Sequence, residues 1–333
     1  MAQRVGLALS GGGAKGAFTV GALKVIRQRL PGANPAFPVI SGTSTGSLIA
    51  TLLTTNDWTT LVKIYSTVTT ENIVNPHHAF VASVLGPQAV LFAAAVIGGK
   101  AIYDTTALKD TIHNNVDFAM IKAAYPATLL LYNTVDLQSG EVVTFTNKTH
   151  APSTLEKALL ASASMPVLMD PIAITAGGST DQYVDGGVRE FLPLGAVFDS
   201  GVDLDLIIGI STAPLSPRTK KDSYTKIIEI LGRTIDLLDT EVGSNDYYGA
   251  QQYNAMLQMI ANADAVGMSK AQLLKDVPDE IRKRLADKRP VPVVLIAPKD
   301  HLDLDSLDFD PIQMRKLMEQ GVTTAKAALD GVL

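Results

Sequence analysis

Two short apolar segments, each followed by a glycine-rich turn and a helical pattern, most constrain the fold of this chain. Residues 5–9 (VGLAL) lead into a turn with three successive glycines, after which residues 17–30 place apolar side chains at helical spacing. Residues 39–40 form a second apolar segment, followed by the turn Gly42–Gly46 and another helical pattern from Ser47. A helix that joins two short buried strands forms a βαβ unit, so these two strands should be parallel.

The rest of the pattern predicts one α/β/α domain. Further apolar runs typical of strands occur at residues 127–135, 141–145, 204–210 and 291–297, and residues 223–262 have mostly helical spacing. A terminal helix should span residues 311–329, with Asp310 as its N-cap. No linker rich in Gly, Pro or Ser divides the chain, and a helical insertion covers about residues 57–125. We therefore expect three layers, α/β/α, with a central, mostly parallel sheet and a helical C-terminal part.

The composition excludes several classes of protein. Of the 333 residues, 47% are hydrophobic and 18% are charged, whereas a disordered chain needs low hydrophobicity and high net charge. The net charge is −5 and no block of Lys and Arg occurs, which argues against binding to nucleic acid. The chain has no cysteine, so disulfides, thiolate metal sites and cysteine nucleophiles are excluded together.

No segment has the pattern of a secretory signal or of an uninterrupted membrane span. Residues 5–9 are too short for the apolar core of a signal peptide and run directly into the glycine turn. The run Ala79–Gly99 is uncharged, but Gly86-Pro87 interrupts it, so we expect two shorter apolar helices that are mostly buried. A lid that meets lipid surfaces is the alternative for this run. The expected location is cytoplasmic or peripheral to a membrane.

The pentapeptide Gly42-Thr43-Ser44-Thr45-Gly46 has the form G-x-S-x-G and lies between an apolar strand and a helix. This is the context of a nucleophile elbow, in which a strained turn lifts the serine hydroxyl out of the sheet. The N-terminus of the following helix also places the positive end of a dipole beside the hydroxyl. We predict that Ser44 is a nucleophile. A plain turn rich in Gly and Ser is the alternative.

The other turn, Ser10–Gly16, has the sequence SGGGAKG. Its glycines permit positive φ and expose successive N–H groups, which suit either an oxyanion or a phosphate. The spacing G-x-G-x-x-G within it fits a dinucleotide site, but no acidic residue follows before Asp57, and Ala17 replaces the lysine of a Walker A loop. An oxyanion loop is therefore the better interpretation.

A third candidate, Asp185-Gly186-Gly187, follows a strand-like segment. An aspartate at a strand end is accessible to other side chains, although Asp-Gly-Gly is also a common turn. Of the five histidines, only His301 follows a late strand, the position of the catalytic histidine in α/β-hydrolases. That fold has several strands before its elbow, whereas only two apolar segments precede Ser44 here.

His301 lies in the aspartate-rich segment Lys299–Asp310, which predicts a solvated acidic loop before the terminal helix. The segment lacks the central glycine and the final glutamate of an EF-hand, so we predict no metal site there.

In this combination and order, the motifs resemble those of the patatin-like phospholipases, and the resemblance runs from about Val5 to Pro193. The glycine loop is similar to the family's GGG-x-[K/R]-G, the elbow to its G-x-S-x-G and the acidic turn to its D-G-[G/A]. Residues 161–166 (ASASMP) are similar to its A-S-x-A-x-P, with Ser164 in place of the second alanine. The matching residues of the first three motifs are Gly11, Gly12, Gly13, Lys15, Gly16, Gly42, Ser44, Gly46, Asp185, Gly186 and Gly187.

The resemblance implies a serine acyl hydrolase with a Ser-Asp dyad on a patatin-like fold. It assigns Ser44 as the nucleophile, Asp185 as the base and the N–H groups of Gly11, Gly12 and Gly13 as the oxyanion hole. Residues 1–200 would form the catalytic core, and residues 201–333 would complete the same domain. The implied substrate is a fatty-acyl ester of a lipid or at a membrane surface. No cofactor, metal or nucleic acid is implied, and no oligomeric state is predicted.

Two alternatives stay open at this point. One is an esterase of the α/β-hydrolase type with a Ser44–His301 triad, and the other is a non-catalytic module that binds a lipid or a nucleotide through the glycine loop. For Lys15, stabilisation of the loop and contact with an anionic head group are both compatible with the sequence.

Overall fold

The computed structural model of the chain describes residues 3–30, 37–73, 75–76, 101, 103–176, 178–217, 219, 223–225, 227–263, 267, 269–285 and 288–333. The uncharged run 79–99 lies outside these residues. The two helices expected there, and the alternative of a lid, therefore stay predictions.

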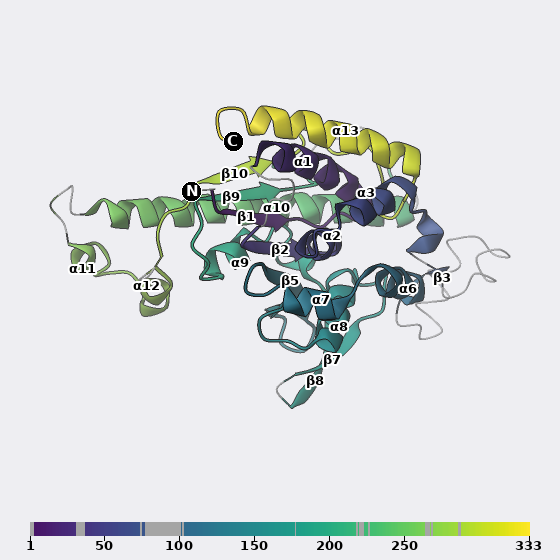
Figure 1. Cartoon of the computed structure of the whole chain (residues 1–333), viewed down its shortest axis with the longest axis horizontal. Coiled ribbons are helices and arrows are strands. Elements are labelled where there is room, and N and C mark those ends of the chain that lie inside the picture. The colour runs from purple at the N-terminus through teal and green to yellow at the C-terminus, as the bar shows by residue number, and fades with distance from the viewer. Residues whose placement is uncertain are drawn as a thin grey trace.

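An eight-stranded sheet forms the centre of the molecule (Figure 1). The strands are β1 (Val5–Leu9), β2 (Val39–Thr43), β5 (Leu129–Asp136), β6 (Val142–Thr146), β7 (Ile172–Ala176), β8 (Ser179–Asp185), β9 (Leu206–Ile210) and β10 (Val293–Ile296). Their order is β10-β9-β1-β2-β5-β8-β7, and β6 pairs with β5 beside this path. Neighbouring strands are parallel from β10 through β9, β1 and β2 to β5, whereas β6, β7 and β8 join the sheet through antiparallel pairs. The sheet is thus mostly parallel, as predicted.

Side chains of the central strands alternate between two cores, which gives the molecule three layers. In β9, Leu206, Ile208 and Ile210 belong to one core and Ile207 to the other. The first core also contains side chains of α1 (Gly16–Arg29), α2 (Thr45–Thr54), α3 (Trp58–Thr67), α6 (Thr106–Asn115), α7 (Phe118–Ala123), α8 (Pro152–Ser162) and α13 (Pro311–Ala328), and the second contains those of α9 (Leu194–Asp199) and α10 (Ile227–Ala261). The predicted α/β/α layering is confirmed.

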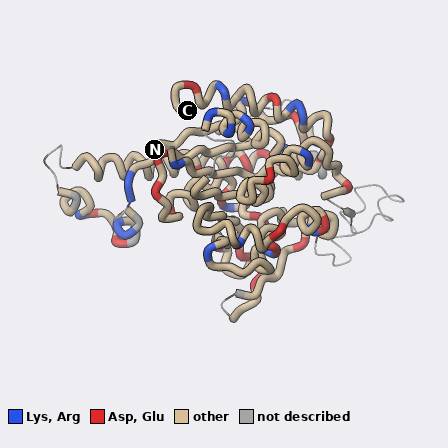
Figure 2. Tube along the Cα trace, in the orientation of Figure 1, with Lys and Arg blue, Asp and Glu red and all other residues tan. Residues whose placement is uncertain are grey.

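Several short elements complete the described chain. They are the 3-10 helices η1 (Gly13–Lys15), η2 (Thr70–Asn72) and η3 (Gly186–Val188), the paired strands β3 (Asn75–Pro76) and β4 (Tyr103–Asp104), and the helices α11 (Lys270–Leu273) and α12 (Asp279–Leu285). Lys and Arg are interspersed with Asp and Glu along the described trace (Figure 2). Among the helices described, none combines the length and the apolar character needed to cross a membrane.

The parallel strands β1, β2 and β9 end at one edge of the sheet, so the turns that follow these three strands lie next to one another. β1 lies between β2 and β9, and Leu9 is in register with Gly42 on one side and Ile210 on the other. β2 runs three residues further than predicted, to Thr43, and α2 begins at Thr45 rather than at Ser47. The turn between them is therefore a single residue, Ser44.

Helices α1 and α13 pack closely on the outer side of the sheet (Figure 1). A Cβ added to Gly21 would lie 2.0 Å from the carbonyl oxygen of Met318, and one added to Gly321 would lie 2.0 Å from that of Phe18. The Asp310 carboxylate caps α13 as predicted, since it accepts the N–H groups of Ile312 and Gln313. Glycine at both contact positions is what lets the two backbones touch.

Replacing Gly321 by alanine should lower the free energy of unfolding by roughly 1–3 kcal/mol, because the added methyl group forces the two helices apart. Gly249→Ala in α10 is the matched control, since among the described residues no atom beyond its own stretch of helix backbone lies within 4 Å of a Cβ added there. At that helical position alanine should stabilise the protein by about 0.5–1 kcal/mol. Urea denaturation measures both variants, and a Gly321→Ala protein as stable as the parent would contradict the close approach.

Candidate active site

Ser44 occupies the one-residue turn between β2 and α2. Its backbone has φ 56° and ψ −128°, a conformation that is unfavourable for a residue with a side chain. Glycines on either side allow the tight turn, because a Cβ on Gly42 would lie 2.5 Å from the carbonyl carbon of Gly46, and one on Gly46 would lie 2.2 Å from the oxygen of Leu9. Gly16 allows the start of α1 to lie close to α2, because a Cβ on Gly16 would lie 2.8 Å from Oγ1 of Thr45.

Asp185 is the last residue of β8 and is buried. Its Oδ1 accepts the N–H of Gly187 at 2.8 Å, and Gly186 lies so close to β5 that a Cβ there would be 2.5 Å from the carbonyl oxygen of Asn133. Desolvation raises the pKa of Asp185 to about 6, although hydrogen bonding by the Ser44 side chain and by Gly187 opposes the rise. The structure thus brings the two residues of the predicted dyad together.

The side-chain hydrogen bond between Ser44 and Asp185 does not have ordinary geometry. Oδ2 of Asp185 is buried, and within the described part of the chain no hydrogen bond of ordinary geometry reaches it. Catalytic hydrogen bonds are often long in a resting enzyme and shorten when substrate binds.

The glycine loop lies against Ser44. A Cβ on Gly11 would lie 3.0 Å from Cβ of Ser44, and Gly12 and Gly13 both have positive φ, at 124° and 55°. The N–H of Gly11 donates to the carbonyl of Phe191 at 3.3 Å. For the N–H groups of Gly12 and Gly13, no hydrogen bond is found among the residues that the structure describes.

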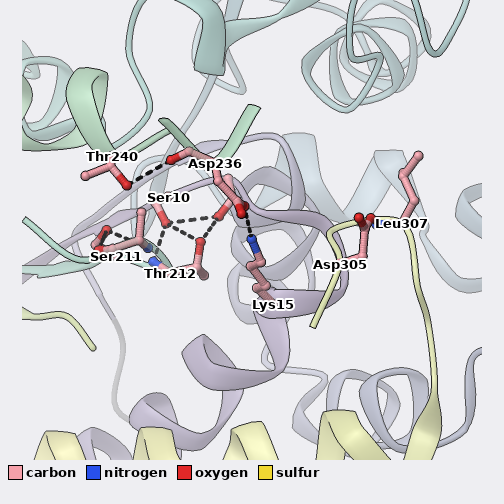
Figure 3. Close-up of polar contacts among 10 residues, drawn as sticks. Ser10, Lys15, Ser211, Thr212, Asp236, Thr240, Asp305 and Leu307 are labelled. Atoms are coloured by element: carbon pink, nitrogen blue, oxygen red, sulfur yellow. Dashed lines mark hydrogen bonds and ion pairs between the residues drawn. The ribbon is translucent and has the colours of Figure 1, made fainter. Parts of the chain in front are cut away.

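Polar side chains from β9 and its loop fix the glycine loop from one side (Figure 3). The Thr212 hydroxyl donates to the carbonyl of Gly11 at 2.5 Å, and the N–H of Thr212 donates to Oγ of Ser10 at 2.9 Å. The Ser10 hydroxyl thus ties the end of β1 to the loop after β9.

Ser162, for which the sequence predicts no role, supports the turn at Ser44. Its Oγ accepts the N–H of Ser44 at 3.1 Å and donates to the carbonyl of Asn133 at 2.7 Å. Two residues later, the carbonyl of Ser164 accepts the N–H of Asp185 at 2.9 Å. The segment 161–166 therefore holds both Ser44 and Asp185, and its match to a fourth family motif was the signal that could have identified it.

An apolar cavity begins at Ser44. Among the residues that the structure describes, the polar residues and glycine in its wall are Gly13, Ser44, Thr45, Thr111, Asn115 and Ser306. The apolar lining comes mainly from α2, α3 and α6 and from the segments 163–169 and 306–309, namely Leu48, Leu52, Ile64, Tyr65, Val68, Ile73, Leu108, Ile112, Val116, Ala163, Met165, Met169, Leu307 and Phe309. Such a lining suits a hydrocarbon chain better than a small polar group.

The segment Lys299–Asp310 is only half solvated, which corrects the prediction of a solvated acidic loop. Leu302, Leu304 and Phe309 are buried, whereas the aspartates between them remain exposed. The carbonyl of Ser306 accepts the N–H of Ala14 at 2.9 Å, so this segment packs on the glycine loop. His301 is not among the residues that line the cavity at Ser44. Among the described residues, no cluster of acidic residues and histidines could hold a metal ion.

The fold together with a family match indicates a lipid ester hydrolase. The sequence model of the patatin-like phospholipases matches residues 7–198, more than half of the chain. The chain therefore belongs to the patatin-like phospholipase family.

Solved structures give distant matches. The crystal structure of VipD from Legionella pneumophila is 12% identical, with a TM-score of 0.41, and the match covers 99% of this chain and 67% of that one. The ExoU–SpcU complex from the type III secretion system of Pseudomonas aeruginosa is 17% identical, with a TM-score of 0.32, over 87% of this chain and 58% of that one. A crystal structure of ExoU covers 86% of this chain at 15% identity and a TM-score of 0.29, and the chain spans 61% of its length. No curated protein matches the chain.

Three more carboxyl groups near the site have raised pKa values. Desolvation raises the pKa of Glu190, Asp239 and Asp246 to about 7 each. Asp246 accepts the N–H of Leu192 at 2.8 Å, which opposes the rise, and the negative charge of Glu190 adds to it. The negative charge of Asp185 likewise adds to the rise at Asp239. The folded protein therefore holds protons that the unfolded chain releases near pH 4.

This proton uptake predicts that stability increases as the pH is lowered. Because the folded pKa of about 7 exceeds the ordinary value of 3.8 for Asp246, its contribution to stability is complete below pH 4 and is lost as the pH rises through 7. The free energy of unfolding, measured in urea, should thus rise between pH 8 and about pH 5. Asp246→Asn should flatten this dependence, whereas Asp303→Asn, on an exposed residue, should leave it unchanged. A slope that Asp246→Asn leaves intact would contradict the assignment.

Proposed function

We propose that Ser44 and Asp185 form a catalytic dyad that hydrolyses fatty-acyl esters of lipids, with the N–H groups of Gly12 and Gly13 as the oxyanion hole. The observation that carries the proposal is the contact of Ser44 with the buried Asp185, because Ser44 lies in a strained turn and also lines an apolar cavity. Aspartate is a weak base, but its pKa of about 6 brings it closer to the range that suits proton transfer near neutral pH.

In the first half-reaction, Asp185 takes the hydroxyl proton while Ser44 Oγ bonds to the ester carbonyl carbon. The negative charge that develops on the carbonyl oxygen lies beside the glycine loop, where preorganised N–H groups stabilise it. The intermediate then collapses, the ester bond breaks, and Asp185 returns its proton to the departing alcohol oxygen. An acyl group remains on Ser44.

In the second half-reaction, Asp185 takes a proton from water and the water oxygen attacks the acyl carbon. When the second tetrahedral intermediate collapses, Ser44 Oγ recovers the proton and the fatty acid leaves. Each proton that Asp185 accepts is returned, so the dyad is restored and no cofactor is consumed.

The hydrogen bonds of the loop favour Gly12 and Gly13 over Gly11 as oxyanion donors. The N–H of Gly11 already donates to Phe191, whereas those of Gly12 and Gly13 make no hydrogen bond within the described residues. The absence of a side chain at Gly11 serves a different purpose, since it lets the loop approach Cβ of Ser44.

Ser44→Ala should reduce kcat for p-nitrophenyl esters by at least about 10³-fold, and Asp185→Asn by roughly 10²- to 10⁴-fold. The first change removes the nucleophile, and the second removes the base but keeps its shape. Asp181→Asn, in the same strand, should retain the parent rate. A fluorophosphonate probe should label the parent protein and leave the Ser44→Ala variant unlabelled.

His301→Ala is the control that separates the dyad from a triad, and it should retain most of the parent activity. A loss as large as that of Ser44→Ala would instead establish the histidine as the base. Ester hydrolysis that survives Ser44→Ala would disprove the dyad itself.

Filling the apolar cavity should shorten the preferred acyl chain. Ile112 lies in the cavity wall on α6 and is buried, so tryptophan there occupies space that a long chain needs. Ile112→Trp should lower kcat/KM for p-nitrophenyl palmitate by roughly 10- to 100-fold more than for the butyrate, since each lost methylene contact is worth about 1 kcal/mol. Ile281→Trp makes the same change at an exposed position on α12 and should leave the ratio unchanged. Equal losses for both esters in Ile112→Trp would refute an acyl-binding role.

A further inference from the structure

Helix α10 lies outside the residues that match the family, 7–198, yet it contacts the candidate active site. Nζ of Lys15, in the glycine loop, lies 2.7 Å from Oδ1 of Asp236 in α10 (Figure 3). The two side chains are only 6% and 19% exposed. An ammonium group buried to this extent needs a partner of opposite charge, because desolvation alone would be costly.

The ion pair lies next to the candidate oxyanion donors in the chain. Lys15 follows Gly13 by two residues, and its N–H donates to the carbonyl of Gly12 at 3.0 Å. Three successive glycines have few conformational restraints of their own, so a fixed orientation of their N–H groups depends on contacts outside the loop. The Lys15 side chain supplies such a contact from the C-terminal side of the loop.

The same helix also contacts the segment that follows Asp185. Asp246 of α10 accepts the N–H of Leu192 at 2.8 Å, and a Cβ on Gly243 would lie 2.9 Å from the ring of Phe191. The carbonyl of Phe191 in turn accepts the N–H of Gly11. Helix α10 therefore holds the glycine loop at both of its ends.

Asp239, one turn after Asp236, adds a second carboxyl group near Lys15. Desolvation raises the pKa of Asp239, the positive charge of Lys15 opposes the rise, and the negative charges of Asp185 and Asp236 add to it. The charge of Lys15 thus acts on both Asp236 and Asp239, which commits its ammonium group to the protein rather than to an anionic head group.

We propose that Asp236 is a positioning residue for the hydrolysis reaction: through Lys15 it fixes the N–H groups of Gly12 and Gly13 where the oxyanion forms. This inference rests on the proposed function, since it assigns those N–H groups to the oxyanion. It makes a helix outside the family-matched residues part of the catalytic machinery.

The test compares Lys15→Met, Asp236→Asn and the double variant with the parent, using p-nitrophenyl butyrate. Each single change should lower kcat roughly 10- to 100-fold, less than the loss of a whole oxyanion donor, with KM within about twofold. Because both residues act through one pair, the double variant should lose about as much as either single variant. Lys15→Arg keeps the positive charge and should therefore retain most of the parent kcat.

Glu241→Gln is the matched control. It removes one carboxylate from the exposed side of α10, five residues from Asp236, and should leave kcat unchanged. The fraction of protein labelled at completion by a fluorophosphonate probe gives the amount of folded enzyme, so kcat is expressed per labelled site. The rate of labelling should fall in parallel with kcat, because the phosphonyl oxygen uses the same donors.

The possible failures are distinguishable. If Asp236→Asn has the parent kcat per labelled site, the positioning role is overturned and the dyad remains intact. The same holds if this variant differs from the parent only in a lower fraction of labelled protein. Losses that multiply in the double variant would also overturn it. If the Ser44→Ala variant is labelled by the probe or hydrolyses the ester, the proposed function itself is wrong, and the positioning role is wrong with it.

Discussion

The candidate active site depends on a close approach of main-chain atoms at the carboxyl edge of the parallel strands. A Cβ on Gly46 would lie 2.2 Å from the oxygen of Leu9, and one on Gly13 would lie 1.9 Å from the oxygen of Ser306. Only glycine fits where backbones touch in this way. The contact keeps the glycine loop against Ser44, so larger residues would separate the hydroxyl from the N–H groups beside it.

Buried charge is the second constraint on this edge of the sheet. Asp185, Glu190, Asp239 and Asp246 all have raised pKa values, while Lys15 supplies the buried ammonium group. The proposed base must be ionised, which requires a pH above about 6, whereas protonation of the other three groups stabilises the fold. For the proposed base, activity and stability are therefore expected to respond to pH in opposite directions, as desolvated carboxyl groups at functional sites allow.

How much the sequence predicted varies from element to element. The βαβ unit was clear, because β1 and β2 are buried on both faces and the helix between them has regular apolar spacing. The hairpin of β7 and β8 was largely missed, since β8 has the sequence STDQYVD and only its last three residues are buried. In the segment Lys299–Asp310 the five aspartates predict solvation, but the apolar residues that alternate with them place one side of the segment against the protein.

The sequence by itself determined the fold class, the family and the chemical groups of the site, because each motif is a local arrangement of strand, turn and helix that its own residues enforce. It could not determine what holds these groups in place. Ser162 reaches Ser44 across 118 residues, and Asp236 reaches Lys15 across 221. Such contacts leave no periodicity in the chain, since they arise only when the packed sheet brings distant segments together. Tertiary structure alone decided that Lys15 faces a helix and that Ser44 opens onto an apolar cavity.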